Sequence, residues 1–421
     1  MTELTWTVPS LRPRWRPGAR RLLPLGPAFV AAVAYVDPGN VATNVTAGAR
    51  HGYLLCWVVV GASVTAMLVQ YLSAKLGLAT GRTLPDHCRE RWSRRTSTAL
   101  WVQAEGVSIA TELAEVLGGA IALRLLFGLA LPWGALATAA GSMAVLLLQR
   151  RTRQGRFEAT VTVLLATCAV GFVVTAWRAG PDPAAIAGSM VPRLHGGDSL
   201  LLAAGILGAT VMPHAVYLHS ALVCDRFDLD GRPTTAAETA RRHRLLRCTR
   251  TDIGLALSFA AVVNLSLVVL AAAALPGAGA DTIEGAQRAV GAVLGPASAT
   301  LFALALLASG LASSSVGAYA GAVVIEGFAG RRVPTVLRRT LTLAPALAVI
   351  ASGVDPTQAL VISQVVLSLG LPFALWPLLT MTRDRAVMGS FVNRRATTAL
   401  AAVAAGAITA LGVLLLTLGL G

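Results

Sequence analysis

Long apolar stretches separated by short polar ones run through almost the whole chain. About eleven of these stretches reach the ~20 mostly apolar residues that a membrane-spanning helix needs. The pattern therefore predicts an all-α, multi-pass membrane protein. The predicted spans are residues 22–48, 53–79, 98–127, 132–149, 157–178, 199–223, 251–275, 296–328, 337–353, 357–381 and 396–419.

The composition agrees with this class. Hydrophobic residues make up 55% and charged residues 13% of the 421 residues, whereas soluble domains carry about 25% charged residues. The basic N-terminal segment leads directly into the first span without a small-residue cleavage site, so no signal peptide is predicted. The five cysteines form no Cys-x-x-Cys pair, so neither a disulfide framework nor a zinc site is predicted.

Positive charge is distributed unevenly among the loops. Thirty of the 35 Lys and Arg residues fall at the N-terminus or in every second connection, which includes the long hydrophilic segment 226–250. By the positive-inside rule this side is cytoplasmic, so we expect a cytoplasmic N-terminus and an external C-terminus in the cell membrane. A nucleic-acid-binding function would need a soluble basic face, and no soluble domain is predicted. The opposite side carries Arg50, Arg124, Arg178, Arg193 and Arg288.

The first span is interrupted by the sequence Asp-Pro-Gly-Asn, residues 37–40. Proline and glycine free backbone groups that lipid cannot satisfy, so such a break survives only where protein or water surrounds it. An aspartate at this depth costs ~2.5–3.5 kcal/mol. We therefore expect Asp37 to face a cavity or a cation; a structural ion pair is the alternative.

The sixth span contains a second break, in GATVMPHAVYLHS, residues 208–220. The two broken spans are five apart, and an odd number places the two five-helix units upside down relative to one another. Broken helices at corresponding places in inverted halves indicate a substrate site near the middle of the membrane. We therefore predict an inverted repeat of helices 1–5 and 6–10, with its site between the two breaks.

The residues at the breaks predict the chemistry of the substrate. Asp37 offers a carboxylate, Asn40 an amide oxygen and Ala209 a backbone carbonyl freed before the proline. These oxygens alone would suit Mg²⁺, Ca²⁺ or Na⁺. Met212 adds a thioether, which favours transition metals over the alkaline earths. A methionine taken alone is more often a packing residue, so its place beside the break is what makes it a candidate ligand.

The strings DPGNVATN, AMLVQYLSAKLGLATGR, ATELAEVLG, MPHAVYLHS, AGAVVIEGF and SQVVLSLGLPFA resemble the NRAMP (natural resistance-associated macrophage protein) family over residues 22–381. The resemblance implies a LeuT-like fold and import of Mn²⁺ or Fe²⁺ together with protons. It also implies a metal site of Asp37, Asn40, Met212 and the Ala209 carbonyl, which Gln364 approaches in some conformations. The metal is then a transported substrate, no resident cofactor is expected, and we expect a functional monomer.

This resemblance divides the chain into three parts. Residues 1–21 are expected to form a cytoplasmic tail and residues 22–381 the transport core. Residues 382–421 are expected to form a cytoplasmic loop and an eleventh helix.

The third span carries three acidic residues at membrane depth. Glu105, Glu112 and Glu115 are spaced seven and three residues apart, which places them close to one helical face. Three carboxylates along one face are typical of a proton relay. The resemblance implies that His214, Arg338 and Arg339 lie near this face. The alternative for the two arginines is a role as surface anchors on the basic side, and His219 is a weaker candidate that would line a cytoplasmic vestibule.

The chain departs from the family pattern at four places. Ala215 stands where the family usually has Asn, and Glu112 stands where it usually has Asp. Leu311 and Ala322 occupy positions often filled by Gln. The lost groups are polar helpers, so these changes affect hydration and the tightness of proton coupling more than metal binding.

Other function classes fit the residues less well. A transporter of amino acids shares the broken-helix architecture, but Asp37 would repel a substrate carboxylate. A Mg²⁺ carrier would not need Met212. An intramembrane metalloenzyme would need an HExxH-type ligand set, and His214 and His219 are five residues apart with no Glu between them. A metal uniporter, or a metal sensor without transport, stays open.

Overall fold

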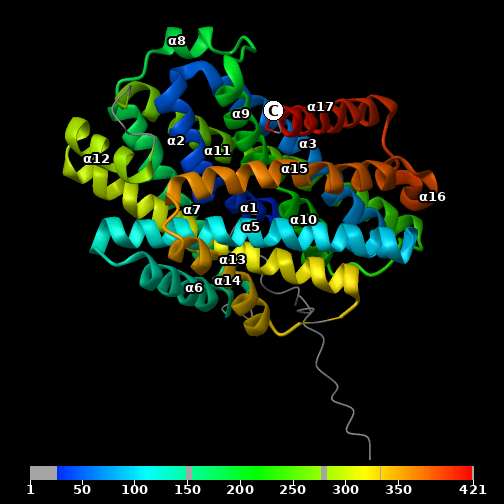
Figure 1. Cartoon of the computed structure of the whole chain (residues 1–421). Helices are drawn as coiled ribbons and strands as arrows, with labels where there is room; N and C mark the ends of the chain where they lie inside the picture. The colour runs from blue at the N-terminus through cyan, green and yellow to red at the C-terminus, as the bar shows by residue number, and fades with distance from the viewer. Residues whose placement is uncertain (1–25, 148–153, 276–281, 332, 420–421) are drawn as a thin grey trace, which may run out of the picture.

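The computed structural model describes residues 26–147, 154–275, 282–331 and 333–419 (Figure 1). Within these ranges the chain forms helices and their connections, and no strand occurs. The all-α prediction is therefore confirmed for this part of the chain. The predicted N-terminal tail, residues 1–21, lies outside it.

The first half of the molecule contains the helices of predicted spans one to five. The first span is interrupted, as the Asp-Pro-Gly-Asn sequence predicts, and a short helix connects the second span to the third. The elements are α1 (Pro27–Ala32), η1 (Val33–Val36), α2 (Pro38–His51), η2 (Gly52–Leu55), α3 (Cys56–Thr80), α4 (Leu84–Arg91), α5 (Arg94–Phe127), α6 (Leu131–Leu147) and α7 (Gln154–Arg178).

The second half repeats this order from another interrupted helix, and one further helix follows it. Helix α11 begins well before predicted span seven, so the segment 226–250 is partly helical. The elements are α8 (Pro183–Gly188), α9 (Gly196–Val211), α10 (Pro213–Phe227), α11 (Ala236–Ala274), α12 (Ile283–Leu294), α13 (Pro296–Ala329), α14 (Thr335–Ala351), α15 (Pro356–Arg383), α16 (Arg385–Met388), η3 (Gly389–Phe391) and α17 (Arg395–Gly419).

All eleven predicted spans are helical over most of their described length, but length and hydropathy alone select fewer of them. By those two criteria, seven described stretches can cross a membrane, or eight if the bent pair α5–α6 counts as one. Helices α2 and α3 count together as one stretch, Pro38–Thr80. Helix α5 carries several charged residues, and α6 and α14 have 17 residues each. Eleven separate crossings therefore stay a prediction.

Helices at equivalent places in the two halves are neighbours in space. Helix α5 packs along α13, α3 packs along α11, and α6 contacts α14. Figure 1 shows α5 and α13 running side by side across the molecule, with α6 and α14 beyond them. The interrupted helices lie inside the bundle, where α2 contacts α9. This arrangement brings the two breaks together.

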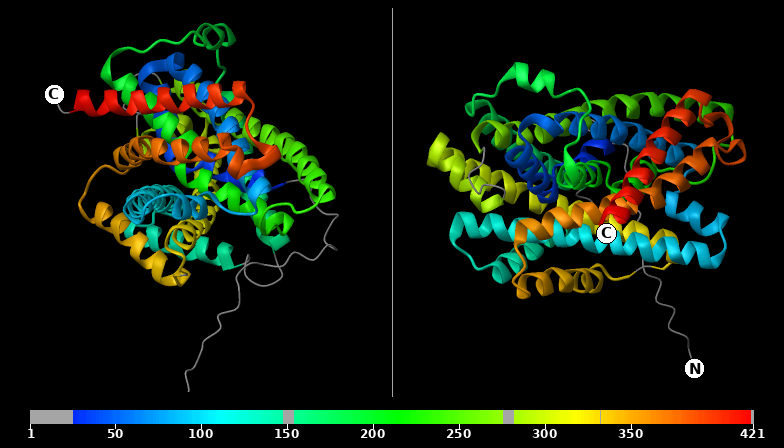
Figure 2. Two further views of the ribbon diagram at one scale, coloured as in Figure 1. Left: turned by 90° about the vertical axis from the view of Figure 1, so that its right-hand side faces the viewer. Right: turned by 45° about the horizontal axis from the view of Figure 1, so that its top comes forward.

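Helix α17 lies at the edge of the bundle against α15, as both views in Figure 2 show. Only 22% of its most apolar stretch is buried by the rest of the protein. Leu400 and Val403 on this helix are 58% and 69% exposed. In a membrane protein, exposed apolar side chains of this kind face lipid.

The polar end of α11 is fixed to the bundle by a buried arginine. Arg242 is 1% exposed, and its guanidinium donates to the carbonyls of Leu78 at 3.1 Å and Gly231 at 2.9 Å. It also pairs with Glu238 at 2.5 Å, and this hydrogen bond holds the pKa of the Glu238 carboxyl below its usual range. Leu78 lies in the last turn of α3, so Arg242 satisfies a helix-end carbonyl that has no partner within its own helix.

We expect Arg242→Lys to destabilise the protein, because a single ammonium cannot reproduce the planar fork of donors. Each buried carbonyl that loses its donor costs about 1–3 kcal/mol. The measurement is the unfolding temperature in detergent micelles. Arg241→Lys on the exposed face of α11 is the control and should leave that temperature unchanged. Equal unfolding temperatures for the two variants would contradict the role given to Arg242.

Candidate metal-binding site

The first break places Asp37 at the start of α2. Its backbone is extended, with φ −77° and ψ 165°, and its carboxylate accepts the backbone N–H of Asn40 at 2.8 Å. The residue is fully buried. Among the described residues it forms no ion pair, and its Oδ2 atom has no hydrogen-bond partner. The alternative of a structural ion pair therefore has no support, and one carboxylate oxygen is left for a ligand.

Side chains from other helices satisfy the carbonyls that this break frees. Asn264 of α11 donates to the Tyr35 carbonyl at 2.8 Å, and Ser309 of α13 donates to the Val36 carbonyl at 2.5 Å. Both bonds are buried. They hold the irregular backbone open without exposing it to lipid, as a broken membrane helix requires.

A third contact fixes the beginning of α1. The carboxylate of Asp252, on α11, accepts the backbone N–H groups of Gly26 and Ala28, each at 3.0 Å. These N–H groups belong to the first turn, where a helix has no acceptors of its own. The N-terminal piece of the broken helix, α1 and η1, is thus attached to α11 at its start as well as at its end.

The second break results from a missing donor. Pro213 has no N–H, so the carbonyl of Ala209, four residues earlier, has no partner in its own helix. That carbonyl instead accepts the side-chain amide of Asn40 at 2.7 Å. Met212 joins the two pieces with φ +38°, a conformation that costs a non-glycine residue ~1–3 kcal/mol. It is fully buried.

The two breaks meet at the side-chain amide of Asn40. Its Nδ2 atom lies 2.8 Å from Asp37 Oδ1 and 2.7 Å from the Ala209 oxygen. Its Oδ1 atom is 3.5 Å from the Thr210 hydroxyl. Two oxygens from opposite halves of the protein are therefore directed at one point, which an NH₂ group fills in this structure.

Gln364 of α15 lies beside the same point. A side-chain carbon on Gly39 would overlap the Gln364 amide and would lie 2.9 Å from Asp37 Oδ2. Glycine at position 39 thus leaves room for the glutamine next to the free carboxylate oxygen. The Oε1 atom of Gln364 has no hydrogen-bond partner among the described residues.

The predicted ligand residues form a buried cluster at the two breaks, where contacts join Asp37, Asn40 and Ala209, Gln364 lies beside Asp37, and Met212 follows Ala209 in the chain. Each has no exposed surface, so the site is shut off from both faces of the membrane in this structure. The described residues contain no group of three or more His, Cys, Asp and Glu side chains that could hold a metal. The cluster consists of Asp37, Asn40, Ala209, Met212 and Gln364.

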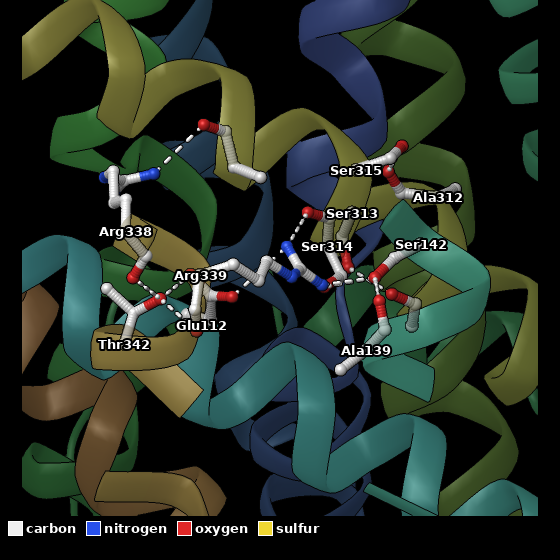
Figure 3. Close-up of polar contacts among 12 residues, drawn as sticks. Glu112, Ala139, Ser142, Ala312, Ser313, Ser314, Ser315, Arg338, Arg339 and Thr342 are labelled. Atoms are coloured by element: carbon white, nitrogen blue, oxygen red, sulfur yellow. Dashed lines mark hydrogen bonds and ion pairs between the residues drawn. The ribbon is translucent and has the colours of Figure 1, made fainter. Parts of the chain in front are cut away.

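Outside this cluster, a buried ion pair joins Glu112 of α5 to Arg339 of α14 (Figure 3). The Arg339 guanidinium is 3.2 Å from Glu112 Oε1, and the Thr342 hydroxyl donates to Glu112 Oε2 at 2.6 Å. The arginine also donates to the Ser314 hydroxyl at 2.6 Å and to the hydroxyl of Ser142. Four helices thus contribute to one charged network.

The arginine side chains are not surface anchors. Arg338 and Arg339 are 5% and 6% exposed, and Arg338 donates to the Ala318 carbonyl of α13 at 3.0 Å. The anchor alternative is wrong, because both guanidinium groups point into the protein and bind polar groups there.

The other acidic residues of α5 have different surroundings. Glu115 is 1% exposed, and neither of its carboxyl oxygens has a hydrogen-bond partner among the described residues. Gly317 of α13 leaves the space that this carboxyl group occupies. Glu105 is partly exposed and accepts from the Trp101 indole at 3.3 Å. The face predicted from the spacing is therefore buried at Glu112 and Glu115 and more open at Glu105.

His214 connects the second break to α5. Its Nδ1 atom is 3.2 Å from the Thr111 hydroxyl, next to Glu112, and its Nε2 atom has no partner among the described residues. His219 does not line a vestibule in this structure, because it is fully buried and hydrogen-bonded to Gln70 at 2.6 Å.

We expect Arg339→Met to lower the free energy of unfolding by about 3–5 kcal/mol, because it leaves the Glu112 carboxylate buried without its counter-charge. Combining it with Glu112→Gln should recover part of that loss. Equilibrium unfolding of the two single variants and the double variant gives the coupling free energy. Additive losses would show that the pair is not coupled.

Known proteins resemble this chain over most of its length. Residues 28–418 match the family described as "Natural resistance-associated macrophage protein-like". A divalent metal cation transporter MntH of Mycobacterium tuberculosis is 53% identical over 394 residues, which cover 93% of this chain and 90% of the relative. The MntH protein of Bacillus subtilis is 45% identical over 403 residues, covering 95% and 93%.

Solved structures share the fold. The Eremococcus coleocola manganese transporter is 32% identical with a TM-score of 0.81, over 92% of this chain and 85% of that chain. Mhp1, a nucleobase-cation-symport-1 family transporter, is 14% identical with a TM-score of 0.59, over 93% and 90%. This second likeness concerns the fold alone and confirms the predicted LeuT-like, all-α architecture. By sequence and fold together, the chain belongs to the Nramp family.

Proposed function

We propose that the protein is a secondary transporter that imports divalent transition-metal ions, Mn²⁺ or Fe²⁺, by alternating access and together with protons. Relatives named as divalent metal cation transporters and as a manganese transporter support the metal. The observation that carries the proposal is the meeting of both helix breaks at the Asn40 amide. The metal is cargo, and we propose no enzymatic activity and no resident cofactor.

The proposed ligands are the carboxylate of Asp37, the carbonyl of Ala209, the side-chain oxygen of Asn40 and the sulfur of Met212. The NH₂ group of Asn40 now lies between two oxygens, at a place that suits a cation. Rotating that amide by half a turn would exchange its NH₂ group for its oxygen and complete an oxygen site. The entering cation would replace the two hydrogen bonds that the rotation gives up.

A transport site must release its ion as well as bind it. Asp37 is the one acidic residue of the ligand cluster, and the described residues contain no cluster of three or more His, Cys, Asp and Glu side chains. A single carboxylate with neutral donors holds a divalent ion less tightly than several charged ligands would. The donor set therefore suits a cargo ion better than a permanently bound one.

Alternating access requires the closed site to open to each face in turn. The short N-terminal piece of the first broken helix, α1 and η1, is held by Asp252 at its start and by Asn264 and Ser309 at its end. We propose that opening toward the basic side moves this piece and breaks the two bonds to Asp252. By the positive-inside rule the basic side is cytoplasmic. We propose that the ion is released on that side, so that the carrier is an importer in the cell membrane.

The proposed proton route runs from the metal site to α5. A carboxylate that coordinates a metal cannot keep a proton, so any proton on Asp37 must leave when the metal enters. His214 and Thr111 lie between the second break and Glu112, and Glu115 is one turn further along α5 with two unpartnered oxygens. The cationic side chains of Arg338 and Arg339 lie along this route, where Arg339 pairs with Glu112, and a nearby positive charge favours onward release of a proton. Glu105 would form the open end of the route.

Two other cargoes are less well supported. A Mg²⁺ carrier would place a sulfur beside a hard ion for no gain in affinity. An amino-acid carrier would need a donor for the substrate carboxylate, whereas the buried cluster presents oxygens with unused acceptor capacity. We further propose that the monomer is functional, because both halves of the site come from one chain.

We expect Asp37→Asn to abolish Mn²⁺ uptake into proteoliposomes, because the proposed site loses its one charged ligand. The matched control is Asn44→Ala, which removes another buried polar side chain from α2, about two turns further on. That variant should retain substantial uptake. Uptake near the wild-type rate in Asp37→Asn would contradict the site assignment.

We expect Met212→Ala to weaken Cd²⁺ binding more than Mn²⁺ binding, because a soft ion gains most from sulfur. Ca²⁺ should then compete for uptake where it does not in the wild type. Val211→Ala, at the neighbouring buried position, controls for loss of packing. The measurement is competition of each ion against Mn²⁺ uptake; an unchanged order of competition would show that Met212 only packs.

We expect Mn²⁺ uptake to rise as external pH falls, with acidification inside the liposomes. Each charge that crosses gains ~2.3 kcal/mol per 100 mV of inside-negative potential. Glu112→Gln should reduce acidification more than Mn²⁺ binding. Both fluxes are measured in the same liposomes, and metal entry without acidification in the wild type would mean that the carrier is a uniporter.

A further inference from the structure

A cavity of about 580 Å³ lies where α15 ends and α17 begins, close to the end of α4. It shares no residue with the metal cluster. Its walls include three arginines, one aspartate and one asparagine. All of these lie on the side of the membrane that carries most of the arginines. They are Arg91, Arg383, Asp384, Asn393 and Arg395.

The charge of the cavity is positive and only partly neutralised. Asp384 pairs with Arg91 at 2.7 Å, and its carboxylate accepts the Ala386 N–H at 2.8 Å. These contacts hold the pKa of the Asp384 carboxyl below its usual range, with the Ala386 N–H as the larger cause. Among the described residues, Arg383 and Arg395 form no ion pair. Two guanidinium groups are therefore available to an anion.

A fourth cation stands behind the cavity wall. Lys75 of α3 is 5% exposed, and its ammonium donates to Asn393 Oδ1 at 2.8 Å. The Asn393 amide in turn donates to the Thr382 hydroxyl at 2.9 Å. The ammonium faces no carboxylate within ion-pair distance in the described part of the chain. A buried charge of this kind is costly unless something nearby balances it.

Thr380 and Thr398 add hydroxyl groups to the cavity wall, and the surface beside them is apolar. Ala399 and Ala402 of α17 line the cavity, and Leu400 and Val403 beside them are exposed. On α15, Trp376 is 42% exposed and donates to the Thr409 hydroxyl of α17 at 3.2 Å. An occupant with an anionic group and attached hydrocarbon would satisfy the arginines and cover this apolar surface together. A free phosphate would satisfy the arginines only.

We propose that this cavity binds the headgroup of an anionic phospholipid of the cytoplasmic leaflet. Arg383 and Arg395 contact the phosphate, and Lys75 balances its charge through Asn393. The acyl chains lie along α15 and α17. Basic pockets between membrane helices on the cytoplasmic side bind such headgroups in other proteins. The bound lipid attaches α17 to α15, the helix that carries Gln364.

The test uses the purified full-length protein in neutral detergent, with phosphatidylglycerol or phosphatidylcholine added. Phosphatidylglycerol should raise the unfolding temperature with saturation, because a ligand of the folded state stabilises it, and phosphatidylcholine should have a much smaller effect. In Arg383→Gln/Arg395→Gln the concentration for half the effect should rise at least about tenfold, roughly 1.4 kcal/mol.

The matched control is Arg241→Gln/Arg244→Gln, which removes the same charge from the exposed end of α11 and should respond as the wild type does. Arg383→Lys/Arg395→Lys should recover part of the response, which separates lost binding from misfolding. An equal response in the cavity variant and the control variant would overturn the proposal. So would equal stabilisation by glycerol 3-phosphate and phosphatidylglycerol at the same concentration, since the ligand would then be a soluble phosphate.

Discussion

The missing N–H of a proline is the constraint on which the rest of this structure depends. Pro213 leaves the Ala209 carbonyl without its helical donor, and in a membrane interior that carbonyl must find another partner. The partner is the Asn40 amide at 2.7 Å, which also contacts Asp37. One carbonyl without a helical donor therefore links the two halves of the protein, through residues that lie about 170 positions apart in the sequence. The proposed metal site lies where the Asn40 amide contacts Asp37 and the Ala209 carbonyl.

The irregular backbone of the broken helices needs hydrogen-bond partners from the surrounding helices. Asn264 and Ser309 satisfy the carbonyls of the first break, and Asp252 satisfies the N–H groups at the start of α1. All three come from α11 and α13, which do not contribute to the metal cluster. These helices form a frame around the broken ones. The short piece formed by α1 and η1 is thus held by a few side-chain hydrogen bonds and not by continuous backbone hydrogen bonds. The proposed opening of the site requires a piece that is held in this way.

The sequence was sufficient to predict both breaks and the approach of Asp37, Asn40 and Ala209 to one another. A proline inside an apolar helix can be recognised from the sequence alone, and the carbonyl that loses its donor is the one four residues earlier. The supporting residues were not predictable in this way. Ser142 and Ser314 bind Arg339 across separations of 197 and 25 residues. A serine in an apolar helix more often bonds its own backbone, so nothing in the local pattern distinguishes these two.

The same limit explains the wrong alternative for Arg338 and Arg339. An arginine pair at the start of an apolar stretch has the pattern of a surface anchor. Only packing shows that Arg338 lies against α13 and that Arg339 lies between α13 and α5. The three glutamates of α5 share a predicted face, yet their surroundings range from an ion pair at Glu112 to two unpartnered oxygens at Glu115. Spacing along a helix fixes direction, whereas tertiary packing fixes the partner.

The proposed transport mechanism depends on where the metal binds. Anomalous X-ray diffraction from crystals of the protein grown with Mn²⁺ measures that position directly. We predict one strong anomalous peak between Asp37 and the Ala209 carbonyl, with the Asn40 amide turned so that its oxygen faces the ion and the Met212 sulfur within bonding distance. A peak elsewhere in the bundle, with Asn40 still donating to Asp37 and Ala209, would contradict the proposed site.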